Sequence, residues 1–331
     1  DGVGCEACHG GAGGWIASHY SVGASHAANV AAGMTALEAP KTRAALCLDC
    51  HYGGSRPGQF VTHEMMAAGH PRISFELDLF TSQQRHYDVD ADYLKRKAWP
   101  SGVKVWAVGQ AMAVDRALTL YGEPARSGAA GVFPELYFFD CQSCHRPVSN
   151  DDPKWRPQAR TNPGRPVPAG QPSFDDENMI MLAAAARAAS PPLAAKFDAD
   201  ARAFHLALAK DRAAAPRAAA ALAATSRQLA DAFAARAFTR ADTLAIFQAL
   251  ASGEGGRRLT DYAGAAQAVM AADTLLSALV AEGALDRAAA ARVRPDLDRA
   301  YAAVHDPNSF RPEAARAALQ AAADKVRGAA R

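Results

Sequence analysis

The sequence repeats one five-residue pattern three times: CEACH at residues 5–9, CLDCH at residues 47–51 and CQSCH at residues 141–145. Each copy holds two cysteines, separated by two residues, and a histidine directly after the second cysteine. The three copies use all six cysteines of the 331-residue chain. C-x-x-C-H is the attachment pattern of c-type haem, so the sequence predicts three covalently bound haem c groups.

The spacing of the pattern follows from the shape of the cofactor. Two thiols on one turn of backbone can add to the two vinyl groups of one porphyrin, and the next residue then lies beneath the iron, where an imidazole nitrogen is a good ligand. The predicted attachment residues are Cys5, Cys8, Cys47, Cys50, Cys141 and Cys144, and the predicted proximal iron ligands are His9, His51 and His145.

Structural zinc and disulfide pairing are the alternatives to haem. Zinc sites usually pair two C-x-x-C units about 12 to 20 residues apart, whereas 38 and 90 residues separate the units here. Disulfides would leave the three adjacent histidines unexplained, and a thioredoxin-like C-x-x-C would need a βαβ context that is absent. Haem is therefore the preferred interpretation.

Seven further histidines are available as second axial ligands, and five of them share the first half of the chain with the cysteines. Crowding of this rare residue is what bis-histidine haems require. The order of preference for distal ligands is His70, His63, His19 and His86, with His26 the weakest. His205 and His305, in the second half, are interpreted as ordinary core or surface residues.

His63 and His70 belong to a short stretch that is expected to be helical and to be closed by Gly69 and Pro71. Seven residues make two turns, so a helix that reached His70 would place both imidazoles on one face, roughly 10.5 Å apart. Such a helix could serve two neighbouring haems.

The first 160 residues resemble the multihaem cytochromes c of the cytochrome c554 type. The resemblance rests on GVGCEACHG at residues 2–10 with Trp15 and His19, on HEMMAAGHPRISF at residues 63–75 and on PELYFFDCQSCH at residues 134–145. It implies closely packed, mostly bis-histidine haems that conduct electrons. It also implies that the family's non-proximal histidines correspond to His19, His63, His70 and His86.

Two departures limit this resemblance. Such cytochromes typically hold four haems, and this chain starts four residues before its first motif, so an upstream haem is expected to be missing or a spare histidine to be left over. The last motif of related sequences often reads C-x-x-C-H-H, whereas Arg146 stands here in place of the second histidine. The resemblance does not reach the second half.

The expected fold is mainly α, with a multihaem cytochrome c domain of helices and loops around the haems, followed by an α-helical bundle. The predicted trihaem domain covers residues 1–146 and includes an amphipathic helix from Val103 to Tyr121. A proline-rich connector covers residues 147–174, since proline fixes φ and removes a hydrogen-bond donor. An Ala-rich helical bundle of six or seven helices covers residues 175–331.

Several sequence features predict where helices of the second half begin or end. Asp175, Asp176 and Glu177 favour a helix start, Ser190-Pro191 favours another, and Thr239 with Asp242 resembles a capping box. Gly253, Gly255 and Gly256 are expected to end the helix that follows Thr239, and a turn at residues 306–308 precedes a last helix from about Pro312. This half contains no cysteine, phosphate-binding loop or nucleophile elbow.

Charge and hydropathy exclude several classes of protein. The chain has 36 Lys and Arg against 34 Asp and Glu, so bulk charge does not favour nucleic acid as a partner. No apolar run approaches the roughly 18 residues of a membrane span, and no signal peptide is visible at Asp1. Because haem is attached outside the bacterial cytoplasm, the expected location is the periplasm or the cell exterior, with the signal peptide already absent.

The sequence therefore predicts an electron-transfer trihaem cytochrome c that relays electrons between redox proteins. Those partners are expected to be basic at the haem edge, because residues 1–150 carry a net −2 before six haem propionates are added. A homo-oligomer or filament is compatible with this interpretation. The alternative is an enzyme with one five-coordinate haem acting on a small nitrogen or oxygen compound, and the surplus of histidines is its only support.

Overall fold

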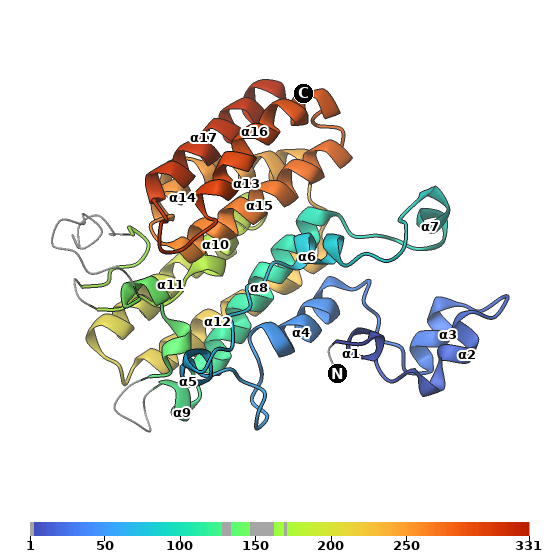
Figure 1. Ribbon diagram of the computed structural model, residues 1–331, viewed down its shortest axis with the longest axis horizontal. Coiled ribbons are helices and arrows are strands. Elements are labelled where there is room, and N and C mark those ends of the chain that lie inside the picture. The colour runs from blue at the N-terminus through green and yellow to red at the C-terminus, as the bar shows by residue number, and fades with distance from the viewer. Residues whose placement is uncertain (1–2, 128–133, 146–161, 169–170, 331) are drawn as a thin grey trace.

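The computed structural model describes residues 3–127, 134–145, 162–168 and 171–330 of the chain. Its fold is mainly helical, as predicted (Figure 1). The described residues contain no strand, and an isolated antiparallel bridge joins Phe139 to Phe174. Most of the predicted connector, residues 147–174, and Arg146 lie outside the described residues, as do short stretches at 128–133 and at the two termini.

The first half of the chain forms mostly short helices. They are α1 (Cys5–His9), α2 (Ile16–His19), α3 (His26–Ala31), α4 (Pro40–His51), α5 (His63–Ala67), α6 (Leu77–Gln83), α7 (Ala91–Arg96), α8 (Gly102–Tyr121) and α9 (Pro124–Ser127), with 3₁₀ turns η1 (Ala12–Gly14), η2 (Leu136–Phe138) and η3 (Cys141–Ser143). The helix predicted from Val103 to Tyr121 is thus confirmed as α8, the longest of this half, but it is buried on nearly all sides and not along one face as an amphipathic helix would be.

The described residues of the second half form eight helices, more than the six or seven predicted, and all of them except α14 have 12 or more residues. They are α10 (Glu177–Ala189), α11 (Pro191–Lys210), α12 (Ala215–Ala235), α13 (Arg240–Ala251), α14 (Gly253–Arg258), α15 (Tyr262–Ala281), α16 (Arg287–Ala303) and α17 (Pro312–Ala329). The predicted starts at Glu177, Pro191 and Pro312 are confirmed. Thr239 and Asp242 form the expected reciprocal capping box at the start of α13.

The glycine-rich stretch after α13 differs from the prediction. Gly253, Gly255 and Gly256 were expected only to end a helix, but these residues form the short helix α14. Gly253 adopts a φ of +61°, a conformation that glycine reaches without steric cost. This left-handed residue changes the direction of the backbone, so a new helix can begin two residues after α13 ends.

Helix α8 joins the two halves of the chain in one hydrophobic core. It is buried on nearly all sides, with Trp106, Val108 and Leu118 almost inaccessible to water. It packs along α4 and α6 from its own half and along α10, α12 and α15 from the second half (Figure 1). The division into separate domains stays a prediction. Helices of the second half nevertheless pack directly against α8 of the cysteine-bearing half.

Helices α6 and α8 approach closely at Gly109. A Cβ atom built on Gly109 would lie 2.6 Å from the Cβ of Leu77, which is too short for two carbon atoms. We expect Gly109→Ala to lower the free energy of unfolding by about 1–2 kcal/mol, because overpacking outweighs the gain in helix propensity. Denaturant unfolding measures the change.

Gly328 is the matched control for this substitution. It lies in α17 with nothing within 4 Å of its built Cβ. Gly328→Ala should leave stability unchanged or raise it by up to about 1 kcal/mol. If Gly109→Ala were as harmless as Gly328→Ala, the α6–α8 contact would have to be looser than described.

Among the described residues, one helix, α15, is long and apolar enough to cross a membrane. Its most apolar stretch has a mean hydropathy of 1.4, and 67% of that stretch is buried within the chain. A core helix passes the same test of length and composition, so α15 is weak evidence for a span.

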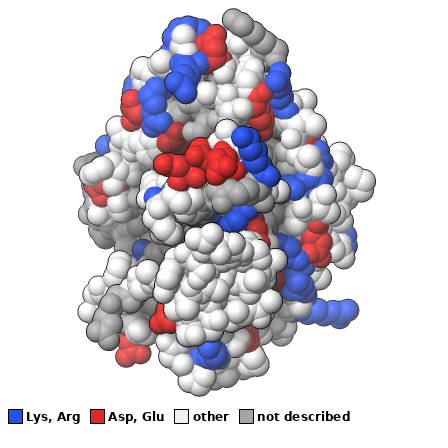
Figure 2. All heavy atoms as spheres, turned by 90° about the vertical axis from the view of Figure 1, so that its right-hand side faces the viewer, with Lys and Arg blue, Asp and Glu red and all other residues white. Residues whose placement is uncertain are grey.

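Residues 3–37 form an N-terminal lobe that stands apart from the helical body (Figure 1). The sequence has no Lys, Arg, Asp or Glu between Glu6 and Glu38. Figure 2 shows the resulting uncharged surface below a cluster of acidic and basic side chains. Ile16, Tyr20 and Val22 are exposed on the lobe.

Candidate functional site

The first C-x-x-C-H motif lies in the N-terminal lobe and coincides with helix α1. The imidazole ring of His9 lies 6.0 Å from that of His86, at an interplanar angle of 89°. His86 lies in the loop before α7, so the fold brings together two histidines that are 77 residues apart in the sequence. Burial, with His86 and His19 nearby, lowers the pKa of His9. The neutral imidazole, which is the form that binds iron, is therefore favoured.

The third motif begins in the turn η3 and ends at His145. The ring of His145 lies 5.9 Å from that of His63, at an interplanar angle of 36°. His63 is the first residue of α5, and its backbone N–H donates to Glu135 Oε1 at 2.8 Å. Because Glu135 lies just before the third motif, this bond helps to hold α5 beside it.

The second motif ends α4, and no other histidine ring contacts His51 among the described residues. The His51 ring instead lies against Phe75 and Phe80, at centroid distances of 5.7 and 5.9 Å. Its Nδ1 lies 2.6 Å from the carbonyl oxygen of Ser74. Since a carbonyl only accepts hydrogen bonds, Nδ1 must carry the proton.

The two imidazole pairs have the spacing of two ligands on one metal ion. An imidazole nitrogen binds a first-row metal ion at about 2.0 Å. The ring centre lies about 1.1 Å beyond that nitrogen, so two imidazoles on opposite sides of one ion have centres about 6 Å apart. The His9–His86 and His63–His145 distances equal this value, as do ordinary ring contacts such as that of His51 with Phe80 at 5.9 Å, so the spacing is compatible with an iron between the rings.

Three histidines have the tautomer that iron ligation through Nε2 requires. The Nδ1 atoms of His51, His70 and His86 lie 2.6, 2.8 and 3.3 Å from the backbone carbonyl oxygens of Ser74, Pro71 and Gln84. Protonation of Nδ1 leaves the Nε2 lone pair free. Metal-bound histidines commonly donate their second N–H in this way.

The expectation that one helix could present both His63 and His70 is wrong. Helix α5 ends at Ala67, and Gly69 has a φ of +109°. This left-handed residue turns the chain, so His70 leaves the helix axis and its side chain is exposed. His63 and His70 therefore do not share a helical face.

The remaining predicted distal candidates have other partners. His19 packs edge-on against Trp15 at 5.5 Å, and its Nδ1 lies 3.5 Å from Asn29 Nδ2. His26 forms a 2.9 Å ion pair with Glu38 when it is protonated. Neither ring is in contact with a proximal histidine in the described part of the chain, and their assignment as ligands stays a prediction.

The structure brings the three motifs close together. Cys8 of the first motif lies near enough to Cys47 of the second to raise the pKa of Cys47, in addition to the larger effect of burial. The hydroxyl of Tyr137, four residues before the third motif, donates to the His51 carbonyl oxygen at 3.2 Å. None of the six cysteines forms a disulfide bond. No group of three or more His, Cys, Asp or Glu residues is placed to hold a metal ion within the described ranges.

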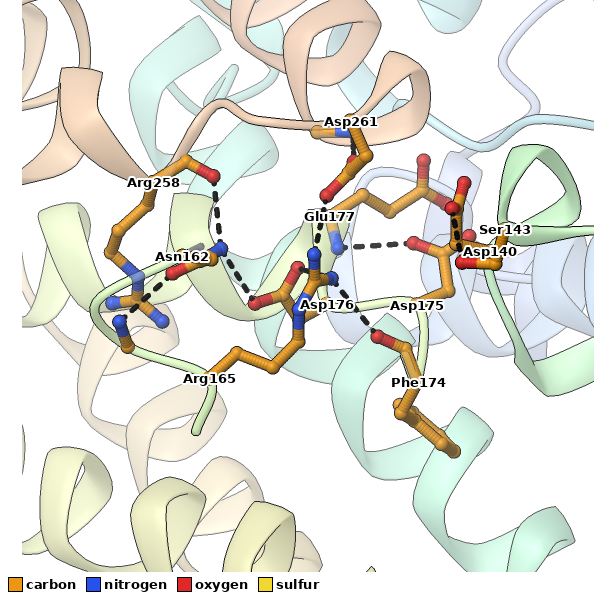
Figure 3. Close-up of polar contacts among 12 residues, drawn as sticks. Asp140, Ser143, Asn162, Arg165, Phe174, Asp175, Asp176, Glu177, Arg258 and Asp261 are labelled. Atoms are coloured by element: carbon orange, nitrogen blue, oxygen red, sulfur yellow. Dashed lines mark hydrogen bonds and ion pairs between the residues drawn. The ribbon is translucent and has the colours of Figure 1, made fainter. Parts of the chain in front are cut away.

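Sequence reasoning missed a network of buried charges beside the third motif (Figure 3). The Arg165 guanidinium donates to Asp176 Oδ1 and Asp261 Oδ2, each at 2.9 Å, and to the Phe174 carbonyl at 3.2 Å. Arg72 forms ion pairs with Asp175 at 2.5 Å and with Glu177 at 3.5 Å. The network thus links the segment after His70 to the first turn of α10.

Burial and neighbouring carboxylates perturb the acids of this network. Burial raises the pKa of Glu177 to about 8, and Asp175 adds to the effect while Arg72 opposes it. Burial also raises the pKa values of Asp140, Asp176 and Asp261. The sequence signal was the acidic run at residues 175–177, directly before an apolar helix that has little exposed surface.

The third motif is also bound to the second half by backbone hydrogen bonds. Asp140 N–H donates to the Ser173 carbonyl, and Asp175 N–H donates to the Phe138 carbonyl, each at 2.9 Å. The segment before Cys141 therefore lies in a fixed position against the entry to α10.

Comparisons of the chain with protein-family models, with curated proteins and with solved structures find no match. The resemblance to the cytochrome c554 type therefore rests on the quoted motifs alone.

Proposed function

We propose that the chain is a trihaem cytochrome c that relays electrons between redox proteins. The observation that carries the proposal is the placement of His86 beside His9 and of His63 beside His145, at the spacing of two axial ligands. Neither pair is close in sequence, and each contains the histidine of a C-x-x-C-H motif.

The chain's own residues would hold and shield the haems. The cysteines at 5 and 8, 47 and 50, and 141 and 144 would form thioether bonds, and His9, His51 and His145 would bind the irons. Bound haem supplies iron that exchanges single electrons. The Nδ1–H bonds of His51 and His86 to carbonyl oxygens orient their rings and, in the neutral imidazole, leave Nε2 as the nitrogen that would bind the iron.

The close packing of the three motifs supports a relay rather than three independent sites. Cys8 is a neighbour of Cys47, and Tyr137 links the second motif to the third. We also propose a periplasmic or extracellular location, because thioether attachment takes place there. The expected partners are redox proteins, and association of several copies would extend the relay.

The proposal predicts three haem c groups per chain, measured by pyridine haemochrome absorbance in the full-length protein after denaturation. Replacing both cysteines of one motif by serine should remove one haem of the three, since neither vinyl group can then be bound. The double variant Cys47→Ser/Cys50→Ser is the sharpest case. A wild-type count of zero would overturn the proposal.

The axial pairs predict which histidines keep their haems low-spin. We expect His63→Ala and His86→Ala each to convert one haem of three to a high-spin form, visible by EPR of the oxidised protein. His26→Ala is the control, because His26 pairs with Glu38. Spectra in which His26→Ala changes a haem, while His86→Ala and His63→Ala do not, would contradict the assignment.

A second candidate function is favoured by the surroundings of His51. Its ring contacts two phenylalanines and no second imidazole among the described residues. The haem of the second motif, called the middle haem below, could then be five-coordinate and bind a small nitrogen or oxygen compound. A high-spin signal in the wild-type protein that disappears on adding cyanide or nitrite would favour this enzyme. Wild-type spectra with no high-spin haem would exclude it.

A further inference from the structure

A chain of buried side-chain hydrogen bonds crosses the core between the two halves. The Tyr52 hydroxyl donates to Asn178 Oδ1, and Asn178 Nδ2 donates to Gln110 Oε1 at 2.8 Å. Gln110 Nε2 makes a longer 3.5 Å contact with Gln267 Oε1, and Gln267 Nε2 donates to the Phe75 carbonyl at 2.6 Å. Every donor points in the same direction along this chain.

These amides are fully enclosed. Gln110 and Gln267 have no exposed surface, and Asn178 is 5% exposed. Moving an amide out of water without a hydrogen-bond partner is unfavourable, so three amides in an apolar core need each other. An apolar core would be simpler to stabilise. What the amides add is a fixed position for the two ends of the hydrogen-bond chain, the Tyr52 hydroxyl and the Phe75 carbonyl.

Both ends of this series of hydrogen bonds lie directly beside His51. Tyr52 follows His51 in sequence, and Phe75 follows Ser74, whose carbonyl accepts the Nδ1–H of His51. The rings of Tyr52 and Phe75 also pack edge to face at 6.3 Å. The hydrogen bonds therefore close a loop that runs from the His51 backbone, through α10, α8 and α15, to the peptide that holds the His51 ring.

The three amides come from both halves. Gln110 lies on α8, whereas Asn178 and Gln267 lie on α10 and α15 of the helical half. A donor at the Phe75 carbonyl fixes the peptide next to Ser74, and so fixes the acceptor for Nδ1. The strength of that Nδ1–H bond sets the basicity and orientation of a ligating imidazole.

We propose that Asn178, Gln110 and Gln267 are positioning residues for the His51 imidazole, through which the helical half tunes the potential of the middle haem. This inference rests on the proposed haem function. It gives the helical half, which has no cysteine of its own, a part in the redox chemistry. Hydrogen bonding around an axial ligand is one of the means by which proteins set haem potentials.

The test replaces Gln267 by Met, which has a similar length and cannot donate. Loss of the donor to Phe75 should loosen the Ser74 carbonyl, weaken the Nδ1–H bond and make the imidazole less electron-rich. The midpoint potential of one haem should rise while the other two stay unchanged, in a spectroelectrochemical titration of the whole protein. The EPR g-values of the same haem should shift.

Gln248→Met is the matched control. Gln248 Nε2 donates to the Ala323 carbonyl at 2.8 Å, between α13 and α17 and within the helical half. Its loss should lower stability without moving any haem potential. Tyr52→Phe is a second test variant, because it removes the other terminal donor, keeps the ring and should shift the same haem.

The outcomes separate the inference from the function on which it rests. Three haems by pyridine haemochrome, with potentials and g-values in Gln267→Met and Tyr52→Phe equal to wild type, would overturn the inference alone. Equal shifts of all three haems would also overturn it, because they would indicate general loosening. A wild-type chain without haem would overturn the proposed function, and the inference with it.

Discussion

Replacing Arg165 by Met is expected to destabilise the folded chain by about 3–5 kcal/mol at pH 7. Arg165 is 5% exposed and lies between Asp176 and Asp261, which are themselves almost inaccessible. Removing the guanidinium leaves two buried carboxylates without this counter-charge. The cost of burying charge without a partner exceeds that of losing an ordinary contact. Urea or guanidinium unfolding measures the change.

The cost should fall as the pH is lowered from 7. In the variant, burial without Arg165 raises the pKa values of Asp176 and Asp261 further than in the wild type. Carboxyl groups with raised pKa values take up protons more readily in the folded than in the unfolded chain, so acid relieves part of the penalty. A loss that grew at low pH would contradict the assigned role.

Arg187→Met is the matched control for Arg165→Met. Arg187 also bridges two carboxylates, Asp198 at 2.9 Å and Glu254 at 3.5 Å, but it lies nearer the surface, on α10, with 33% of its side chain exposed. Exposed ion pairs are typically worth about 0–1 kcal/mol. Comparable losses in the two variants would mean that burial does not decide the strength of the Arg165 contacts.

We compare the free energy of unfolding of His205→Leu with that of the wild type. This difference is expected to shift in favour of the variant by about 2–3 kcal/mol when the pH is lowered from 7.5 to 4.5. His205 is fully buried, and neither ring nitrogen has a hydrogen-bond partner in the described structure. Burial, with the charges of Arg165 and Arg258 nearby, lowers its pKa to about 3.

The sign follows from the two protonation states. The pKa of His205 is about 3 in the folded chain against a usual 6.5 in the unfolded chain. Between these values the unfolded chain binds the proton and the folded chain does not, so the wild type loses stability as the pH falls below 6.5. Leucine cannot be protonated, and the variant escapes this loss.

Unfolding curves of both proteins at the two pH values give the difference. His305→Leu, at an exposed position, is the control for replacing a histidine by leucine. An equal effect of His205→Leu at the two pH values would show that His205 is protonated when folded.

Local sequence signals predicted the helices well, because each signal acts over a few residues. The periodicity of α8, proline at the starts of α11 and α17, and the capping box at Thr239 are all found where they were expected. The same reasoning failed near His70, where Gly69 turns the chain before the second imidazole.

Long-range pairing could not be predicted in this way. His86 stood fourth among the distal candidates, yet it lies beside His9, because the fold closes a loop of 77 residues that no local pattern reports. Arg165 belongs to the proline-rich connector, and its partner Asp261 is 96 residues away. The amides around His51 are similarly ordinary residues of helix interiors until three helices bring them together.

The N-terminal lobe has a consequence for the kinetics of association. Its polypeptide contributes no fixed charge between Glu6 and Glu38, and electrostatic steering depends on such charges and weakens as salt screens them. A molecule that docks on the protein surface of this lobe would meet it at a rate nearly independent of ionic strength. Any salt dependence of electron delivery at the first motif would then report charges outside residues 7–37, among them the propionates of the proposed haem.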